Sequence, residues 1–375
     1  MKIGILTLPL HTNYGGILQA YALQTVLQRM GHEVIVLNKD RHVKTRYWRI
    51  PFRIVNKCLG RNTIIFYERY VNRIIDTTEQ YTSQFISKHI HSLKFRSFDN
   101  INFNYFDAIV VGSDQVWSPL HGRSLCGSVI NAFLPFTNGL KLKRIAYAAS
   151  FGKDYWEYSE EETEQAKQLI KLFESISVRE NSGVELCKTY LCAKAVKTLD
   201  PTLLLDSEDY LSLIPKENLI RNNNEMLVYI IDNTDDKSHI VSTVSSLLHL
   251  TPNIVNSRVE DNSGKKYELR EMVQPPVESW LNGFKNASCV VTDSFHACVF
   301  SILFRKNFIA IGNKERGLTR FVDLLSSLGL EKNLILDSCE LTDELINMKI
   351  DYIAVYEKLN KMRDYSFDYL AKVLS

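Results

Sequence analysis

One short stretch of the chain combines residue types suited to proton transfer and anion binding. An apolar run at 289–291 is typical of a buried parallel strand, and the polar trio at 292–294 stands where a helix should begin. His296 then falls in the first turn of that helix, at the carboxyl end of the strand, where open α/β folds build their ligand sites. The pattern predicts an imidazole that can exchange a proton with a bound substrate.

Cations follow the next expected strand, at 308–311. The three cations lie close together in sequence: Lys314, Arg316 and Arg320. The unpaired N–H groups at the expected helix start beside Ser294 also attract anions. Together with the imidazole they favour a small, strongly anionic donor. The alternatives are a structural histidine at a helix start and an ordinary solvated loop.

A further cation is expected at the same edge of a sheet. Arg179 follows a short strand-like run at 176–178 and precedes Glu180. It could bind an anion or form a structural ion pair, and the residues alone leave both open.

Two other expected strand ends carry polar and aromatic side chains. The loop after the first strand has glycines, but not in the GxGxxG spacing of a dinucleotide site. This loop could line a ligand site, where it would provide a polar contact, an aromatic ring and a close approach of the backbone to the ligand. The alternative is a tight turn that needs glycine. The loop after 106–111 places a Trp beside Asp and Gln, a grouping suited to a sugar ring. The candidate acceptor contacts are Asn13, Tyr14, Gly15, Asp114, Gln115 and Trp117.

Residues 39–73 differ from the rest of the chain in charge. They hold ten Lys or Arg against two acids, Asp40 and Glu68, so the segment carries +8 in a chain with a net charge of +2. Aromatic and aliphatic residues alternate with these cations, which is typical of a membrane-surface patch. The alternative is a solvated helical hairpin that covers the sheet.

The totals describe an ordinary globular enzyme. The chain has 375 residues, 45% of them hydrophobic, and the small net charge gives no argument for a nucleic-acid partner. No secretion signal or membrane-spanning run is recognised, and the seven Cys lack metal-site spacing. We therefore expect a cytoplasmic protein with no metal and no cofactor, and the alternative is a peripheral position at the inner face of the membrane.

The elements that position these residues alternate between strands and helices. This alternation predicts an α/β fold with two doubly wound, Rossmann-like domains, arranged as in the GT-B architecture, and with C-terminal helices. The expected division is an acceptor-side domain at 1–200 that carries the basic insertion, a donor-side domain at 207–350, and a helical segment at 351–375. Residues 198–206 are taken as the linker, because Asp-Pro breaks the preceding element.

Several motifs, in order, resemble the polysaccharide pyruvyl transferase family. They are TLPLHTNYGGILQAYALQ near the start, VGSDQVW, ISVRE, LDPTLLL and VTDSFHACVFSILFRKNFIAI. The resemblance implies a GT-B-like fold that needs no metal. It also implies transfer of a pyruvyl group from phosphoenolpyruvate to two hydroxyls of a sugar in a surface polysaccharide, to form a cyclic ketal. The acceptor could be free or lipid-linked.

The resemblance also assigns roles to residues. The family's catalytic histidine falls on His296 and its donor-binding arginine on Arg179. Many members carry an Arg two residues before that histidine, where this chain has Ser294, so this phosphate or carboxylate ligand is either missing or supplied by Arg316 or Arg320. Two alternatives remain: a GT-B glycosyltransferase that uses a nucleotide sugar, and a non-catalytic partner in polysaccharide assembly.

Overall fold

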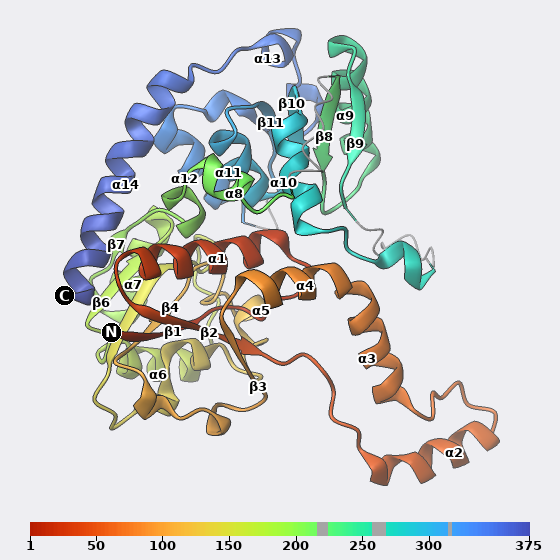
Figure 1. Cartoon of the computed structure of the whole chain (residues 1–375), viewed down its shortest axis with the longest axis vertical. Coiled ribbons are helices and arrows are strands. Elements are labelled where there is room, and N and C mark those ends of the chain that lie inside the picture. Colours follow the sequence, from red (N-terminus) through yellow and green to blue (C-terminus); the bar gives the residue numbers. More distant parts are fainter. Residues whose placement is uncertain (216–223, 257–267, 314–316) are drawn as a thin grey trace.

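The computed structural model describes residues 1–215, 224–256, 268–313 and 317–375, and it contains two sheets surrounded by helices (Figure 1). Every strand pair in both sheets is parallel. Parallel strands are buried on both faces because the crossover helices cover them, and β4 is accordingly buried along its whole length. The expected α/β class with two doubly wound units is confirmed.

The first sheet has seven strands in the order β3-β2-β1-β4-β5-β6-β7. The first strand of the chain, β1, lies inside this sheet, where Ile3 pairs with Val34 on one side and Ala108 on the other. The strands are β1 (Lys2–Leu6), β2 (Glu33–Lys39), β3 (Ser92–Phe95), β4 (Ala108–Val111), β5 (Lys143–Ala149), β6 (Ser175–Val178) and β7 (Val196–Lys197). Its helices are α1 (Tyr14–Arg29), α2 (Ile50–Cys58), α3 (Tyr67–Thr78), α4 (Gln80–His89), α5 (Pro119–Gly122), α6 (Glu160–Ile170) and α7 (Asn181–Leu191).

The second sheet has five strands in the order β12-β11-β10-β8-β9. Its strands are β8 (Glu225–Tyr229), β9 (Thr251–Ile254), β10 (Cys289–Thr292), β11 (Asn307–Ile311) and β12 (Leu334–Ile335). The helices of this half are α8 (Ser207–Leu211), α9 (Asp235–Leu248), α10 (Val277–Asn286), α11 (Phe295–Leu303), α12 (Leu318–Leu328), α13 (Asp343–Asn347) and α14 (Tyr352–Leu374). The division at 1–200, 207–350 and 351–375 stays a prediction.

Each sheet has one point where the strand order reverses direction. In the first sheet the chain builds outward from β1 through β2 and β3, and then from β4 in the other direction. In the second sheet the reversal lies between β8 and β10. Loops at the carboxyl ends of such strand pairs diverge and leave room for a ligand, so β1, β4 and β10 are the strands best placed to build a site.

One apolar core joins the two sheets. It includes Ile3 and Ile17 from the first half and Trp280 and Phe300 from the second, all of them fully buried. Tyr14, in the first turn of α1, is part of this core, and its ring packs at a tilt against Trp280 with the ring centres 5.3 Å apart. Burial of this kind holds the two sheets in a fixed relative position.

The C-terminal helix α14 runs from the second half down to the first (Figure 1). The Arg363 guanidinium donates to the carbonyls of Leu203 and Leu205 at 2.6 and 2.9 Å and pairs with Asp206 at 2.8 Å. Near the end of the helix, Tyr369 donates its hydroxyl to a carbonyl of β5 at 3.1 Å. The helix therefore ties the segment between the sheets to the first sheet.

Replacement of Arg363 tests this connection. We expect Arg363→Ala to lower the free energy of unfolding by about 2–4 kcal/mol, because two buried carbonyls lose their donor. Denaturant unfolding measures the change, and Lys361→Ala, at an exposed position on the same helix, is the control. An equal effect of the two substitutions would contradict the assigned role of Arg363.

Candidate active site

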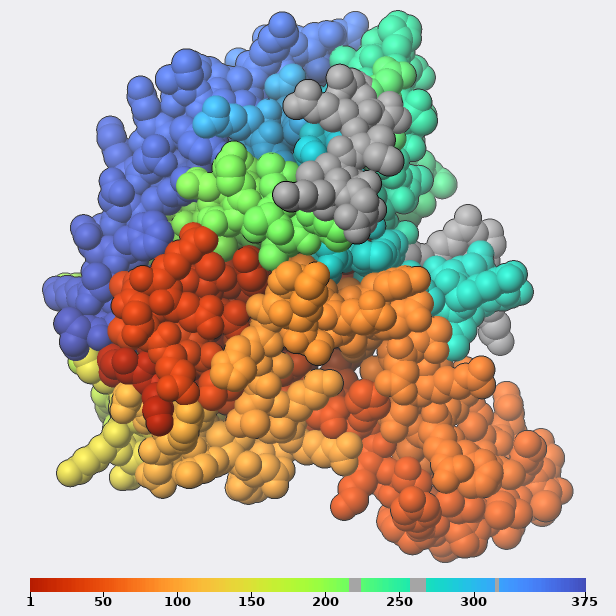
Figure 2. Space-filling model, in the orientation of Figure 1, coloured from red at the N-terminus to blue at the C-terminus, as the bar shows by residue number. Residues whose placement is uncertain are grey.

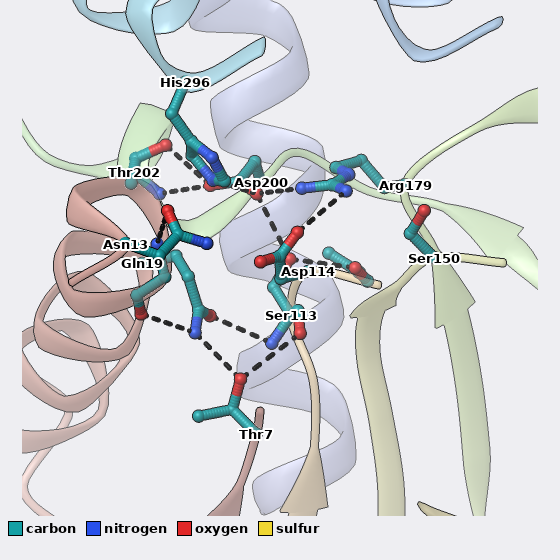
Figure 3. Close-up of polar contacts among 12 residues, drawn as sticks. Thr7, Asn13, Gln19, Ser113, Asp114, Ser150, Arg179, Asp200, Thr202 and His296 are labelled. Carbon is teal, nitrogen blue, oxygen red and sulfur yellow. Dashed lines mark hydrogen bonds and ion pairs between the residues drawn. The ribbon is translucent and has the colours of Figure 1, made fainter. Parts of the chain in front are cut away.

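A buried cluster of charged side chains lies between the two sheets, at the carboxyl ends of the strands (Figure 3). Its centre is Arg179, directly after β6. The Nη1 atom of Arg179 lies 2.8 Å from Asp200, Nη2 lies 3.4 Å from Asp114, and Nε lies 3.3 Å from Glu180. A buried guanidinium needs such partners, because an unpaired charge in the interior is costly. The ion-pair alternative for Arg179 is therefore present in the structure.

His296 enters this cluster from the second sheet. It is buried in the first turn of α11, and its Nε2 atom lies 3.7 Å from Asp200 Oδ2, within ion-pair distance but too far for a hydrogen bond. Among the described residues, Nε2 of His296 has no hydrogen-bond partner. Ser294 caps α11, since its Oγ accepts from the Ala297 amide at 3.5 Å. A buried imidazole nitrogen without a partner is a candidate group for substrate contact.

Gly15 makes room for the His296 ring. A Cβ atom built on Gly15 would lie 2.1 Å from Nδ1 of His296, so only glycine fits at this position. Asn13, two residues earlier, caps α1 by accepting from the Gly16 amide at 3.2 Å, so α1 begins within the glycine-bearing loop. The glycines after β1 thus allow a helix start to approach the imidazole closely.

Hydroxyl and amide groups hold Asp200 from the other sides. The Thr202 amide and hydroxyl donate to Oδ1 at 3.0 and 2.6 Å, and Ser113 Oγ lies 3.2 Å from Oδ2. Gln19, on α1, accepts from the Ser113 amide at 3.1 Å and donates to Thr7 at 2.8 Å. Loops from β1, β4 and the segment after β7 are joined in this way (Figure 3).

Two carboxylates of the cluster, those of Asp114 and Asp200, stay ionised because of their neighbours. Burial alone raises the pKa of a carboxyl group. For Asp114 and Asp200, His296 and Arg179 outweigh burial and hold the pKa below its ordinary value. Asp114 and Asp200 therefore remain negatively charged and can stabilise a positive charge on the neighbouring imidazole.

A second guanidinium lies close to the first. Arg320, in the first turn of α12, has its Cζ 5.6 Å from the centre of the Phe295 ring, and Arg179 has its Cζ 4.6 Å from the same ring. Burial, followed by the charge of Arg179, lowers the pKa of Arg320 to about 10. A bound anion would offset both effects. The other two candidate cations, Lys314 and Arg316, lie outside the described residues.

His11 lies at the edge of this cluster, near Arg41 and Asp114. Burial, followed by the charge of Arg41, lowers the pKa of His11 to about 4. The ring is therefore neutral near pH 7. Within the described part of the chain, no group of three or more His, Cys, Asp and Glu side chains is arranged so that it could hold a metal ion.

Comparison with known proteins assigns the chain to a family. The sequence profile described as polysaccharide pyruvyl transferase matches residues 13–315, which is most of the chain. The chain belongs to the polysaccharide pyruvyl transferase family. Membership implies a transferase with a polysaccharide substrate. A comparison with curated protein sequences gives no match.

Solved structures confirm the fold of this pyruvyl transferase family member. Arabidopsis thaliana UGT89C1 complexed with UDP-L-rhamnose superimposes with a TM-score of 0.52 at 9% identity, over 99% of this chain and 98% of that one. UDP-GlcNAc 2-epimerase from Neisseria meningitidis bound to UDP-GlcNAc gives 0.50 at 12% identity, over 100% and 99% of the two chains. At such low identity these similarities establish the GT-B-like fold alone.

Four of the six expected acceptor contacts lie in or beside the charged cluster. Asp114 belongs to it, and Gly15 lies against His296. Asn13 is exposed at the start of α1, and the half-buried Gln115 packs against Gly152. Two others are core residues: the ring of Tyr14 packs against Trp280, and Trp117 stacks on Phe133. Both rings are fully buried and offer no face to a sugar, which corrects the expectation drawn from their types.

Sequence reasoning missed Asp200 as a site residue. Residues 198–206 were interpreted as a linker, but Asp200 caps η6 (Pro201–Leu204) by accepting from the Thr202 amide. The signal was present in the motif LDPTLLL, because Asp followed by Pro is typical of a helix start. Ser113, Thr202 and Gln19 carry no comparable signal, since their roles depend on tertiary contacts.

The fit between Gly15 and His296 leads to a prediction. We expect Gly15→Ala to lower the free energy of unfolding by about 1–3 kcal/mol, because the added methyl group overlaps the imidazole ring. In a His296→Ala background the same substitution should cost much less. Denaturant unfolding of the double-mutant cycle measures this coupling, with Gly16→Ala as the control. A cost that is unchanged by the loss of His296 would contradict the contact.

The lowered pKa of Asp200 gives a pH-dependent prediction. Its charge stabilises the fold above the ordinary carboxyl pKa of about 4, and this contribution is lost as the pH falls below that value. Asp200→Asn should therefore lower the free energy of unfolding by about 3–5 kcal/mol at neutral pH, and by progressively less in acid. Unfolding curves between neutral and acid pH measure the difference, with Asp154→Asn, at an exposed position, as the control. A difference independent of pH would count against the buried ion pair.

Proposed function

We propose that this protein transfers a pyruvyl group from phosphoenolpyruvate to two hydroxyls of a sugar, forming a cyclic ketal in the biosynthesis of a bacterial surface polysaccharide such as a capsule or exopolysaccharide. The observation that supports this most is His296, whose buried Nε2 atom has no hydrogen-bond partner among the described residues and faces Asp200 beside two guanidinium groups. The family membership supports the reaction class.

The chemistry requires a group that moves protons. A sugar hydroxyl adds to C2 of phosphoenolpyruvate while the methylene carbon takes up a proton. Phosphate then leaves, and the second hydroxyl attacks the same carbon and loses its proton. The products are one ketal and one phosphate. We assign the proton transfers to His296, with Asp200 as the carboxylate that orients the imidazole and stabilises its protonated form.

The donor carries several negative charges and needs cations. We assign donor binding to Arg320, together with Lys314 and Arg316, and with Ser294 at the start of α11. Arg179 already faces three carboxylates, which leaves part of its guanidinium N–H groups for a donor. We propose two roles for Arg179. Its remaining N–H groups contact the donor, and its ion pairs position Asp114 and Asp200.

The acceptor is assigned to the loops of the first sheet. Asn13 and Gln115 keep accessible polar groups beside the cluster, and Asp114 lies at its edge near His11. We propose that these groups bind the saccharide, and that the reaction takes place in the cytoplasm. A lipid-linked acceptor would place it at the inner face of the membrane.

Turnover with phosphoenolpyruvate tests the proposal. We expect phosphate release only when phosphoenolpyruvate and a saccharide with a suitable pair of hydroxyls, such as a galactoside, are both present. His296→Ala should lower kcat by about 10²–10⁴-fold, because general acid–base catalysis is lost. His239→Ala, at an exposed position on α9, is the matched control and should leave kcat unchanged.

A second substitution separates donor binding from proton transfer. Arg320→Ala should chiefly raise KM for phosphoenolpyruvate, since it removes a cation rather than a proton donor. Consumption of a nucleotide sugar in place of phosphoenolpyruvate would support the glycosyltransferase alternative. No turnover with any of the saccharides tested would support the non-catalytic alternative.

A further inference from the structure

A helical hairpin stands clear of the rest of the molecule. It consists of η1 (Tyr47–Arg49), α2 and α3, and it projects from the first sheet as a separate lobe (Figures 1 and 2). No residue of η1 or α2 is buried, and on α3 only Glu68 is. The hairpin therefore does not cover the sheet, which corrects that interpretation of residues 39–73.

The outer surface of the hairpin carries an apolar stripe, made of Trp48, Phe52, Val55 and Leu59. Their spacing of four, three and four residues places them on one face of a continuous helical segment. They are 64%, 67%, 57% and 66% exposed, respectively. A globular protein rarely leaves a full helical stripe of large apolar side chains in water unless another surface covers it.

Cations surround the apolar stripe. Two arginines of the basic segment are neutralised within the protein: Arg53, within the hairpin, pairs with Glu68 at 2.5 Å, and Arg41, at the start of the connection from β2, pairs with Glu79. Seven other cations have no carboxylate within ion-pair distance among the described residues: Lys44, Arg46, Arg49, Lys57, Arg61, Arg69 and Arg73. The uncompensated charge is therefore positive and is concentrated on the projecting lobe.

Aromatic rings and cations also line a groove within the hairpin. The groove has a volume of about 680 Å³ and contains no acidic side chain. Its cationic lining is Lys57, Arg61, Arg69 and Arg73, and its apolar lining includes Phe66 and Tyr70. This combination suits the phosphate groups of lipids, because arginine binds phosphate oxygens while the rings lie at the headgroup level.

The ion pair of Arg53 with Glu68 fixes the shape of the lobe. Nη1 and Nη2 of Arg53 donate to the two carboxylate oxygens of Glu68 at 2.5 and 2.8 Å, and both side chains are largely enclosed between α2 and α3. This contact holds the two helices together on their inner side. The apolar stripe is left facing outward.

From this surface we propose that the hairpin docks the protein onto a bilayer of anionic lipids. The apolar stripe lies in the headgroup region, and the surrounding cations bind the lipid phosphates. None of the helices in the described ranges has both the length and the apolar character needed to cross a bilayer. This docking does not depend on the proposed reaction.

The hairpin is connected to the same edge of the first sheet that carries the candidate active site. The chain enters the hairpin from the carboxyl end of β2, the edge of the sheet from which the loops after β1 and β4 build the charged cluster. Arg41, at the start of this connection, lies next to His11. If the proposed function holds, docking brings that edge to the leaflet where a lipid-linked saccharide would be presented.

Vesicle cosedimentation of the full chain tests the proposal. We expect binding to phosphatidylcholine vesicles that contain phosphatidylglycerol, and little binding to phosphatidylcholine alone. The double variant Trp48→Ser/Phe52→Ser should lower the partition coefficient by about tenfold or more, because two large apolar groups no longer enter the interface. The matched control is Ile353→Ser/Tyr365→Ser, two exposed positions on α14, which should bind as the wild type does.

A charge variant tests the cations separately. Each of Lys57→Gln and Arg69→Gln should weaken binding by about fivefold, and added salt should weaken wild-type binding, since charge attraction near the surface is screened. Lys171→Gln and Lys188→Gln, at exposed positions on the body of the protein, are the controls.

Three results would overturn the docking proposal. They are equal binding to neutral and anionic vesicles, vesicle binding that survives loss of the apolar stripe, and a lipid-free dimer that the stripe variant dissociates. The last result would make the hairpin a self-association surface. Turnover of phosphoenolpyruvate with a soluble saccharide is expected to be unchanged in all hairpin variants, so failure of docking and failure of the proposed reaction are distinguishable.

Discussion

The structure of the site depends on the burial of one positive charge. Arg179 is almost fully enclosed, and three carboxylates, Asp114, Asp200 and Glu180, come from separate loops to meet its guanidinium. A buried guanidinium without these partners would be strongly destabilising, so the ends of β4, β6 and the segment after β7 must converge. His296 completes the arrangement, because its imidazole faces the same carboxylate that Arg179 binds.

The fold supplies the rigid frame that this convergence requires. Strand order reverses at β1 and β4 in one sheet and at β8 and β10 in the other, and the cluster draws residues from the loops after β4 and β10. The shared apolar core and α14 fix the sheets relative to each other, so an imidazole on α11 can meet carboxylates of the first sheet. Gly15 then sets how closely α1 approaches that ring.

Much of the fold and part of the site could be predicted from the sequence. Apolar runs that end in polar residues marked the strands β1, β4 and β10, and they placed His296 at a helix start, because these signals are local. The side-chain environments could not be predicted. Trp117 and Tyr14 have the residue types of sugar contacts, yet tertiary packing buries both. Asp200 lies in a segment that the sequence predicted as a linker. Its role could not be predicted because its partners, Arg179 and His296, are distant in sequence.

The central claim is that this charged cluster is the place where a small anionic donor meets a proton-transfer group. A crystal structure of the protein with phosphoenolpyruvate bound tests it most directly. We expect the donor between the Arg320 guanidinium and His296, with its methylene carbon facing Nε2 of the imidazole. Electron density for phosphoenolpyruvate at another place on the molecule, with the cluster unchanged and empty, would contradict it.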